Sequence, residues 1–356
     1  MLLPRSFAFH VTYTCPLRCA HCCFHSGPEN KFRLSADTIS DFIDNLGESI
    51  EMVAFTGGEP FLLGEQLVHA VRRAAQRGFV TRIVTSAYFG KNRDAALRRL
   101  SALKDAGLRE LSISWDDFHE EFVHFSAIRN VFEIARELGI LVAVNVVQSA
   151  QSKWSALRVR SELGLASDDD SVICESPLNR TGRAADELQD HDLRSVRTLG
   201  PCPYVLTGPT LSAKGDLLAC CGVIPNDERL TIAPAAEAKE LSSALAQAQA
   251  STLLNWLYLR GPYDIIRFIG EHFDVKVPPR HTIGGNCEAC AILFGNESIA
   301  HRIDEALALK VDEVAGELSV LRALNWLDPR AVLAMWGKSG LIDTAHLHPS
   351  TQDCGQ

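Results

Sequence analysis

Short apolar runs alternate with amphipathic segments along the first half of the chain. The apolar runs have the length and composition of buried strands, and they predict strands at residues 7–12, 52–55, 80–85, 111–114, 140–147 and 171–174. Between them, apolar residues at helical spacing predict a helix capped by Ser35 and helices at about 64–77, 92–105, 126–138 and 152–163. Glycines stand where three of these helices should end, at Gly78, Gly107 and Gly139. This alternation indicates parallel strands joined by right-handed crossovers.

The number of strand–helix units limits the architecture. Six units occupy roughly the first 180 residues, too few for a closed eight-stranded barrel but enough for an open one. We therefore expect an α/β fold, with a partial (β/α)6 barrel over residues 1–185. In such barrels the chemistry gathers at the carboxyl ends of the strands. A cysteine-rich loop follows the first predicted strand, and Gly-Gly-Glu-Pro (57–60) follows the second.

After residue 184 the alternation is lost. A hairpin is predicted at Leu211–Cys220 with its turn at Lys214–Gly215, followed by an Ala-rich helix at 234–250 and helices at about 298–326. We expect a small second domain over residues 186–296 and a helical C-terminal segment over 297–356.

Composition and charge narrow the class of protein. The 356 residues carry a net charge of −9, which argues against a nucleic-acid surface, because phosphate binding needs clustered Lys and Arg. No apolar run is long enough for a membrane span, and the N-terminus lacks the features of an export signal, so we expect a cytoplasmic protein. Eleven cysteines occur, mostly in clusters, and clustered thiols in a cytosolic protein indicate metal binding rather than disulfides.

The strongest motif is the spacing Cys15-x3-Cys19-x2-Cys22. Three thiolates can hold three irons of a [4Fe–4S] cluster and leave the fourth iron open to a ligand. The alternative is a zinc site, for which Cys23 or His21 would supply a fourth ligand. The spacing and its place after the first strand resemble the radical S-adenosylmethionine (SAM) superfamily. That resemblance implies that SAM binds the open iron and is cleaved to a 5′-deoxyadenosyl radical that abstracts hydrogen.

The same resemblance implies contacts to SAM at several positions. Gly57, Gly58 and Glu59 correspond to the segment that meets its amino group, although a plain turn before a helix is the alternative. Ser114 and Asp116 correspond to residues that hold the ribose hydroxyls, and a strand end with a helix cap is the alternative. His21 corresponds to the planar ring near the adenine; a histidine that only orients its neighbours by hydrogen bonds is the alternative.

A second cysteine pattern lies in the second half of the chain. Its predicted ligands are Cys202, Cys220, Cys287 and Cys290. The pattern resembles the short auxiliary-cluster module, called twitch, of some radical SAM enzymes, and no further cysteine follows soon after Cys290 as the longer SPASM module would require. We therefore expect one auxiliary [4Fe–4S] cluster, with a four-thiolate zinc site as the alternative.

Residues 8–296 most resemble the radical SAM peptide epimerases that make D-residues in epipeptides. The likeness runs through CAHCCFHSGP, FTGGEPFL, LSISWDDFHEEFV, GDLLACC and CEACAILFGN. It implies that Cys221 donates hydrogen to the substrate radical; a buried free thiol is the alternative. The chain departs from that family where Ser86-Ala87 replaces Asn-Gly, where PYVLTG after Cys202 lacks an acidic residue, and in its longer tail.

The resemblance implies a function and its partners. We expect hydrogen abstraction from a ribosomally made precursor peptide, with inversion at an α-carbon and with a flavodoxin- or ferredoxin-type electron donor. The peptide is expected to bind at the barrel mouth or the C-terminal region. A radical SAM dehydrogenase or peptide cross-linking maturase is one rival, and a non-enzymatic metal-binding or interaction protein is another. Fold alone does not decide among them.

Overall fold

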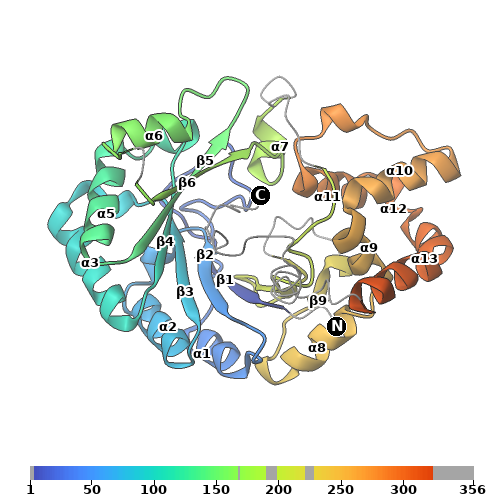
Figure 1. Ribbon diagram of the computed structural model, residues 1–356, viewed down its shortest axis with the longest axis horizontal. Helices are drawn as coiled ribbons and strands as arrows, with labels where there is room; N and C mark the ends of the chain where they lie inside the picture. The colour runs from blue at the N-terminus through green and yellow to red at the C-terminus, as the bar shows by residue number, and fades with distance from the viewer. Residues whose placement is uncertain (1–3, 167–168, 190–198, 221–227, 324–356) are drawn as a thin grey trace, which may run out of the picture.

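The computed structural model describes residues 4–166, 169–189, 199–220 and 228–323 (Figure 1). Six strands follow one another in the first half, at β1 (Ser6–Thr12), β2 (Met52–Gly57), β3 (Val80–Thr85), β4 (Glu110–Ser114), β5 (Leu141–Gln148) and β6 (Val172–Pro177). The helices between them are α1 (Ala36–Asn45), α2 (Glu65–Gln76), α3 (Arg93–Ala106), α4 (Asp117–Glu120), α5 (Phe125–Glu137) and α6 (Ala156–Glu162), with 3-10 turns η1 (Pro60–Leu63) and η2 (Tyr88–Lys91). The predicted α/β alternation is confirmed.

The strands form one open sheet in the order β6-β5-β4-β3-β2-β1-β7-β8-β9. Strands β1 to β6 pair in parallel, and β7 (Thr210–Leu211) continues in parallel beside β1. The hairpin partner β8 (Leu217–Leu218) and then β9 (Thr231–Ala233) add antiparallel pairs. Figure 1 shows the helices of the first half on the outer, convex side of this curved sheet. The sheet is therefore a partial barrel whose carboxyl strand ends face one mouth.

Local sequence explains where the helices begin and end. The Ser35 side chain accepts a hydrogen bond from the N–H of Thr38 and caps α1, as predicted. Asn92 caps α3 in the same way, and α3 ends at Gly107 with a φ of 105°, a left-handed conformation that favours glycine. These signals were readable in the sequence because caps and glycine stops depend on neighbouring residues only.

The two faces of the sheet differ in chemistry. On β1, Phe7 and Phe9 are fully buried against the helices in the first hydrophobic core. The opposite, inner face carries small and polar side chains, among them Thr56, Ser114 and Asn145, which are only half-buried. Because a barrel interior without apolar filling leaves room for polar ligands, this inner face is where a bound molecule would lie.

The second half is mainly helical and has a hydrophobic core of its own around Trp256. Its elements are α7 (Arg183–Glu187), η4 (Glu228–Leu230), η5 (Ala238–Glu240), α8 (Leu241–Ala248), α9 (Thr252–Arg260), α10 (Pro262–Phe273), η6 (Arg280–Thr282), α11 (Asn286–Gly295), α12 (Glu297–Ala300) and α13 (Ile303–Ala323). The hairpin predicted at 211–220 is confirmed. The Ala-rich helix begins at Leu241, later than predicted, because β9 and a left-handed Ala235 precede it.

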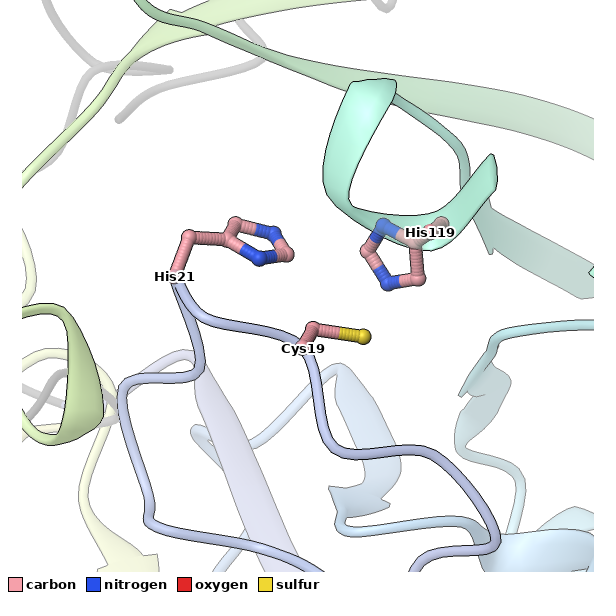
Figure 2. Close-up of side chains that lie close together, drawn as sticks. All are labelled: Cys19, His21 and His119. Carbon is pink, nitrogen blue, oxygen red and sulfur yellow. The ribbon is translucent and has the colours of Figure 1, made fainter. Parts of the chain in front are cut away.

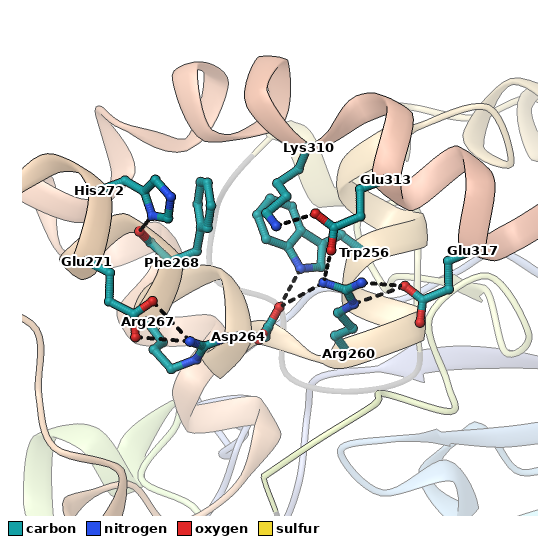
Figure 3. Close-up of polar contacts among 10 residues, drawn as sticks. All are labelled: Trp256, Arg260, Asp264, Arg267, Phe268, Glu271, His272, Lys310, Glu313 and Glu317. Atoms are coloured by element: carbon teal, nitrogen blue, oxygen red, sulfur yellow. Dashed lines mark hydrogen bonds and ion pairs between the residues drawn. The ribbon is translucent and has the colours of Figure 1, made fainter.

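An ion-pair network joins three of these helices (Figure 3). Arg260 of α9 contacts Glu313 at 2.7 Å and Glu317 at 2.9 Å, both on α13. Asp264 of α10 accepts a hydrogen bond from the Trp256 indole N–H at 2.9 Å. The network therefore holds α13 against α9 and α10. None of the helices that the structure describes is both long and apolar enough to cross a membrane.

Candidate functional site

The predicted cluster ligands Cys15, Cys19 and Cys22 lie in the loop between β1 and α1, at the barrel mouth. The loop is tied down by its own backbone, because the N–H of Cys15 donates to the Gly27 carbonyl at 3.2 Å and that of Cys22 to the Cys19 carbonyl at 3.1 Å. Cys19 is buried, and the other two thiols are half-buried. All three sulfurs are thus held in one sheltered loop.

The electrostatics of this loop favour protonated thiols unless a cation is bound. Burial raises the pKa of Cys15 to about 12, helped by the charges of Glu59 and Cys22. Burial also raises the pKa of Cys19, with further contributions from Asp116, Cys15 and Cys22. The three cysteines therefore influence one another electrostatically. Metal ligation requires thiolates, and bound cationic metal supplies the missing counter-charge, so the donor set fits a metal cofactor.

The distances among the ligand atoms test whether Cys15, Cys19 and Cys22 could bind one zinc ion instead of a cluster. Ligand atoms of one zinc ion lie within about twice a metal–sulfur bond, or ~4.6 Å. In the described residues, one group of three has ligand atoms within 4.8 Å of one another, namely Cys19, His21 and His119 (Figure 2). Cys15 and Cys22 are not in that group, and neither are the later cysteines that the structure describes. Sulfurs that bind separate irons of one cluster need no such short separation.

The His21 ring lies in an aromatic and acidic pocket beside the cysteine loop. It stacks on Phe118 with centroids 4.6 Å apart and planes at 15°, and it meets the His119 ring edge-on at 4.9 Å. Its Nε2 lies 3.3 Å from Asp116. The Nδ1 atom is buried and has no hydrogen-bond partner among the residues described. An unpartnered ring nitrogen at this place is compatible with the predicted ligand contact of His21.

Asp116 caps a helix in the structure, which was the alternative to its predicted contact with the ribose. Its side chain caps α4 by accepting hydrogen bonds from the N–H groups of Phe118 and His119. It also accepts from His119 Nδ1 at 2.8 Å. Burial alone would raise its pKa, but His119 and His21 outweigh burial and hold it well below the usual range. The ribose contact of Asp116 stays a prediction, as does that of Ser114, which lies half-buried at the end of β4.

Gly57 and Gly58 bring β2 against the cysteine loop. A Cβ at Gly57 would lie 2.5 Å from the Thr12 carbonyl oxygen, and one at Gly58 would lie 2.3 Å from that of Thr14. Both positions therefore need glycine for this close approach. The N–H groups of Gly58 and Glu59 donate to the carbonyls of Thr12 and Thr14, which places this turn beside the start of the cysteine loop.

Glu59 is fully buried, and its carboxylate points to the end of β3. It accepts hydrogen bonds from the Thr85 hydroxyl at 2.8 Å, the Ser86 hydroxyl at 2.7 Å and the N–H groups of Phe61 and Ser86. Burial raises its pKa, although the donors of Ser86 and Thr85 oppose that shift. Its contact with the SAM amino group stays a prediction.

The second cysteine set gathers around the second core. Cys287 and Cys290 lie on α11, Cys202 precedes β7, and Cys220 follows β8. Cys202, Cys220 and Cys290 all pack against the second core. Burial, with the charges of Cys202 and Cys287, raises the pKa of Cys290 well above its usual range. Cys221 lies outside the described residues. Cys174, on β6 beside Asn145, is disulfide-bonded, so the expectation that the cysteines bind metal rather than form disulfides is wrong for this residue.

Sequence reasoning missed three residues of these sites. His119 could have been noticed, because it stands three positions after Asp116 in a helical segment. Glu288, between Cys287 and Cys290, is 3% exposed and binds Arg180. Arg183 is 4% exposed and contacts the first cysteine loop from α7. No sequence signal pointed to the last two, because their partners lie more than 100 positions away.

Residues 9–147 match the model of the radical SAM superfamily. The chain is 22% identical over 241 residues to YydG of Bacillus subtilis strain 168, which is named for peptide biosynthesis; the match covers 64% of this chain and 72% of YydG. It is 29% identical over 153 residues to GTP 3′,8-cyclase of Campylobacter fetus subsp. fetus, covering 38% of this chain and 44% of the cyclase. The solved structure of native anSMEcpe with bound AdoMet and Cp18Cys peptide aligns with a TM-score of 0.51 at 12% identity, over 89% of this chain and 99% of that one.

Proposed function

Residues 9–147 form a radical SAM domain, and on that premise we propose that the protein abstracts a hydrogen atom from a ribosomally made peptide and inverts an α-carbon. One observation supports a peptide as the substrate. The similarity to YydG extends over 241 residues, more than the radical SAM match contains, so the two chains also resemble each other outside the shared domain.

Different residues of the first site would bind the cluster and SAM. Cys15, Cys19 and Cys22 would hold a [4Fe–4S] cluster, and Gly57 and Gly58 would present backbone carbonyls to SAM. When bound, these groups supply a 5′-deoxyadenosyl radical that abstracts hydrogen. The inner face of the sheet carries polar, half-buried side chains that would bind amides of the peptide.

Inversion needs a hydrogen donor on the face opposite to abstraction. We assign that role to Cys221, whose S–H bond breaks as a C–H bond forms on the peptide radical. One electron and one proton then restore the thiol, and a flavodoxin- or ferredoxin-type protein would supply the electron. Cys202, Cys220, Cys287 and Cys290 would hold a second cluster near the hydrogen donor. Packing of three of these four against one core supports that assignment.

The test uses a synthetic copy of the peptide encoded by a short reading frame beside the gene. Incubated anaerobically with SAM and reductant, the protein should give a peptide of unchanged mass that contains a D-residue. In heavy water the product should gain one deuterium at the inverted carbon, because a thiol hydrogen exchanges with solvent. A product lighter by two hydrogens would instead support the dehydrogenase or cross-linking alternative.

The group formed by Cys19, His21 and His119 favours a second candidate, a mononuclear metal site in a non-enzymatic protein. Zinc would be held there by one sulfur and two nitrogens, with water in a fourth position. Metal analysis of protein purified without oxygen separates the candidates. Iron with inorganic sulfide supports the cluster, whereas one equivalent of zinc without iron supports the mononuclear site.

A further inference from the structure

A buried arginine underlies the first cysteine loop. Arg183 is the first residue of α7, which follows β6 and lies between the barrel and α11 (Figure 1). Its guanidinium donates to the carbonyl of Cys19 at 3.0 Å and to that of Ser26 at 2.6 Å. Its backbone N–H donates to the Cys22 carbonyl at 2.9 Å. One residue thus holds the loop at both of its last two predicted ligands.

The preceding glycine permits this close approach. Gly182 has a φ of 56°, and a Cβ there would lie 2.2 Å from the Cys23 carbonyl oxygen and 2.8 Å from that of Cys22. A side chain would push the start of α7 away from the loop. The contact between Arg183 and the loop is therefore built into the backbone and does not depend on a flexible side chain alone.

Within the described residues, Arg183 has no carboxylate partner closer than 3.9 Å. A backbone hydrogen bond, with the charges of Arg18 and Arg183, lowers the pKa of Glu29, but that carboxylate is exposed to solvent. The ion pair of Arg183 is with Glu187, at 3.9 Å from Nε, and the Glu187 side chain is 46% exposed. The carbonyl acceptors satisfy hydrogen bonds but carry no net charge. A guanidinium that is 4% exposed is costly unless an opposite charge compensates it.

We propose that Arg183 is a positioning residue for the cluster on Cys15, Cys19 and Cys22, and that the negative charge of this cluster is its counter-charge. Three thiolates outweigh the two positive charges of an oxidised cubane core, and reduction adds a further electron. A fixed cation therefore stabilises the reduced state more than the oxidised state and raises the reduction potential. The proposal rests on the cofactor of the radical SAM domain and not on the peptide reaction.

Arg180, three residues before Arg183, provides a matched control. Arg180 donates to Glu288 through its Nε and its backbone N–H, both at 3.1 Å, and forms an ion pair with that carboxylate. Its charge is compensated by a protein carboxylate that is 3% exposed, and its partner lies in the second cysteine set. Loss of Arg180 should therefore leave the potential of the first cluster unchanged.

The experiment measures iron per chain and the midpoint potential of the first cluster, by EPR-monitored titration of the full, reconstituted chain without peptide. The first cluster is recognised by the change in its signal when SAM is added. Arg183→Gln should shift its potential to more negative values, Arg183→Lys should stay near wild type, and Arg180→Gln should cause no shift. Glu187→Gln should shift it to more positive values, because an opposing negative charge is removed.

Two results would overturn the proposal. One is an iron-replete Arg183→Gln variant whose first cluster keeps the wild-type potential. If Arg183→Gln does not take up iron, Glu187→Gln decides, because this half-exposed position should not affect folding; no positive shift there is the second result. Failure of the wild-type chain to form any cluster on the three cysteines would refute the cofactor assignment itself. If the wild-type chain forms the cluster but does not modify a peptide, only the proposed function is contradicted.

Discussion

The Tyr13 hydroxyl lies 3.2 Å from Nδ1 of His10, at the inner face of β1. His10 is 1% exposed, and burial lowers its pKa to about 3. Burial raises the pKa of Tyr13 to about 12, although the backbone of Ala213 in the β7–β8 hairpin opposes that shift by hydrogen bonding. Both rings are therefore uncharged around neutral pH, and the pair connects the barrel to the hairpin without introducing a charge.

This pair predicts how stability depends on pH. In the unfolded chain His10 binds a proton below about pH 6.5, whereas in the folded protein it stays neutral until about pH 3. The unfolded state thus binds more protons between these values, and the free energy of unfolding should fall as pH falls. The slope from this residue approaches ~1.4 kcal/mol per pH unit.

Urea unfolding at pH 7.5, 6.0 and 5.0 measures this slope. The His10→Gln variant should show a shallower dependence than wild type, because glutamine does not titrate. His69→Gln, at an exposed position on α2, should keep the wild-type slope. Equal slopes for wild type and His10→Gln would show that the His10 ring is protonated in the folded state.

The second prediction concerns the iron content. The reconstituted chain should hold about eight irons if both cysteine sets bind cubane clusters. Changing Cys15, Cys19 and Cys22 together to Ala should remove about half the iron and all cleavage of SAM. Cys23→Ala, at a neighbouring thiol that is not a predicted ligand, should keep both. Formation of 5′-deoxyadenosine by the triple variant would refute the assignment of the first site, and zinc at the later cysteines would refute only the second cluster.

A third prediction follows from the hydrogen bonds of Glu59. Glu59→Gln turns one acceptor oxygen into an NH2 group that faces the donors of Thr85 and Ser86. Because buried donors would lose their acceptor, the free energy of unfolding should fall by about 1–3 kcal/mol. Glu65→Gln, at an exposed position in the first turn of α2, should change it by less than about 0.5 kcal/mol. A loss of SAM binding in Glu59→Gln at unchanged stability would instead favour direct contact with SAM.

The strands of the barrel could be predicted from the sequence because their signals are local. β-branched and apolar runs mark β3 and β5, and Gly107 marks the end of α3. The loop of Cys15, Cys19 and Cys22 was a local signal too, because these three cysteines lie within eight residues of one another; their role as cluster ligands stays a prediction.

The remaining features depend on residues that are far apart in the sequence. Arg183 meets the Cys19 carbonyl across 164 positions, and Arg180 meets Glu288 across 108. The direction of the Glu59 carboxylate is set by Thr85, the last residue of the next strand, and by Ser86, which follows it. The late start of α8 has a similar cause, because β9 pairs with β8 and takes residues that alone would favour a helix. Local propensity cannot foresee such tertiary pairings.

The last prediction concerns Cys221, the proposed hydrogen donor. Cys221→Ala should keep both clusters, because Cys220, which packs against the second core, is the predicted ligand. The variant should still cleave SAM and form the peptide radical, since abstraction precedes hydrogen return. Without a donor on the opposite face that radical should persist or decay to other products. An EPR signal of a carbon radical, with little D-residue on chiral analysis of the hydrolysed peptide, is the expected result.

Cys23→Ala again serves as the control and should epimerise the peptide as wild type does. In heavy water the wild-type product should carry one deuterium at the inverted carbon, while the 5′-deoxyadenosine should carry none, because its new hydrogen comes from the peptide. Normal epimerisation by Cys221→Ala would place the donor elsewhere. Loss of about half the iron from that variant would mean that Cys221 is the ligand and Cys220 the donor. The Cys220→Ala variant would verify this exchange of roles if it kept its iron and lost inversion.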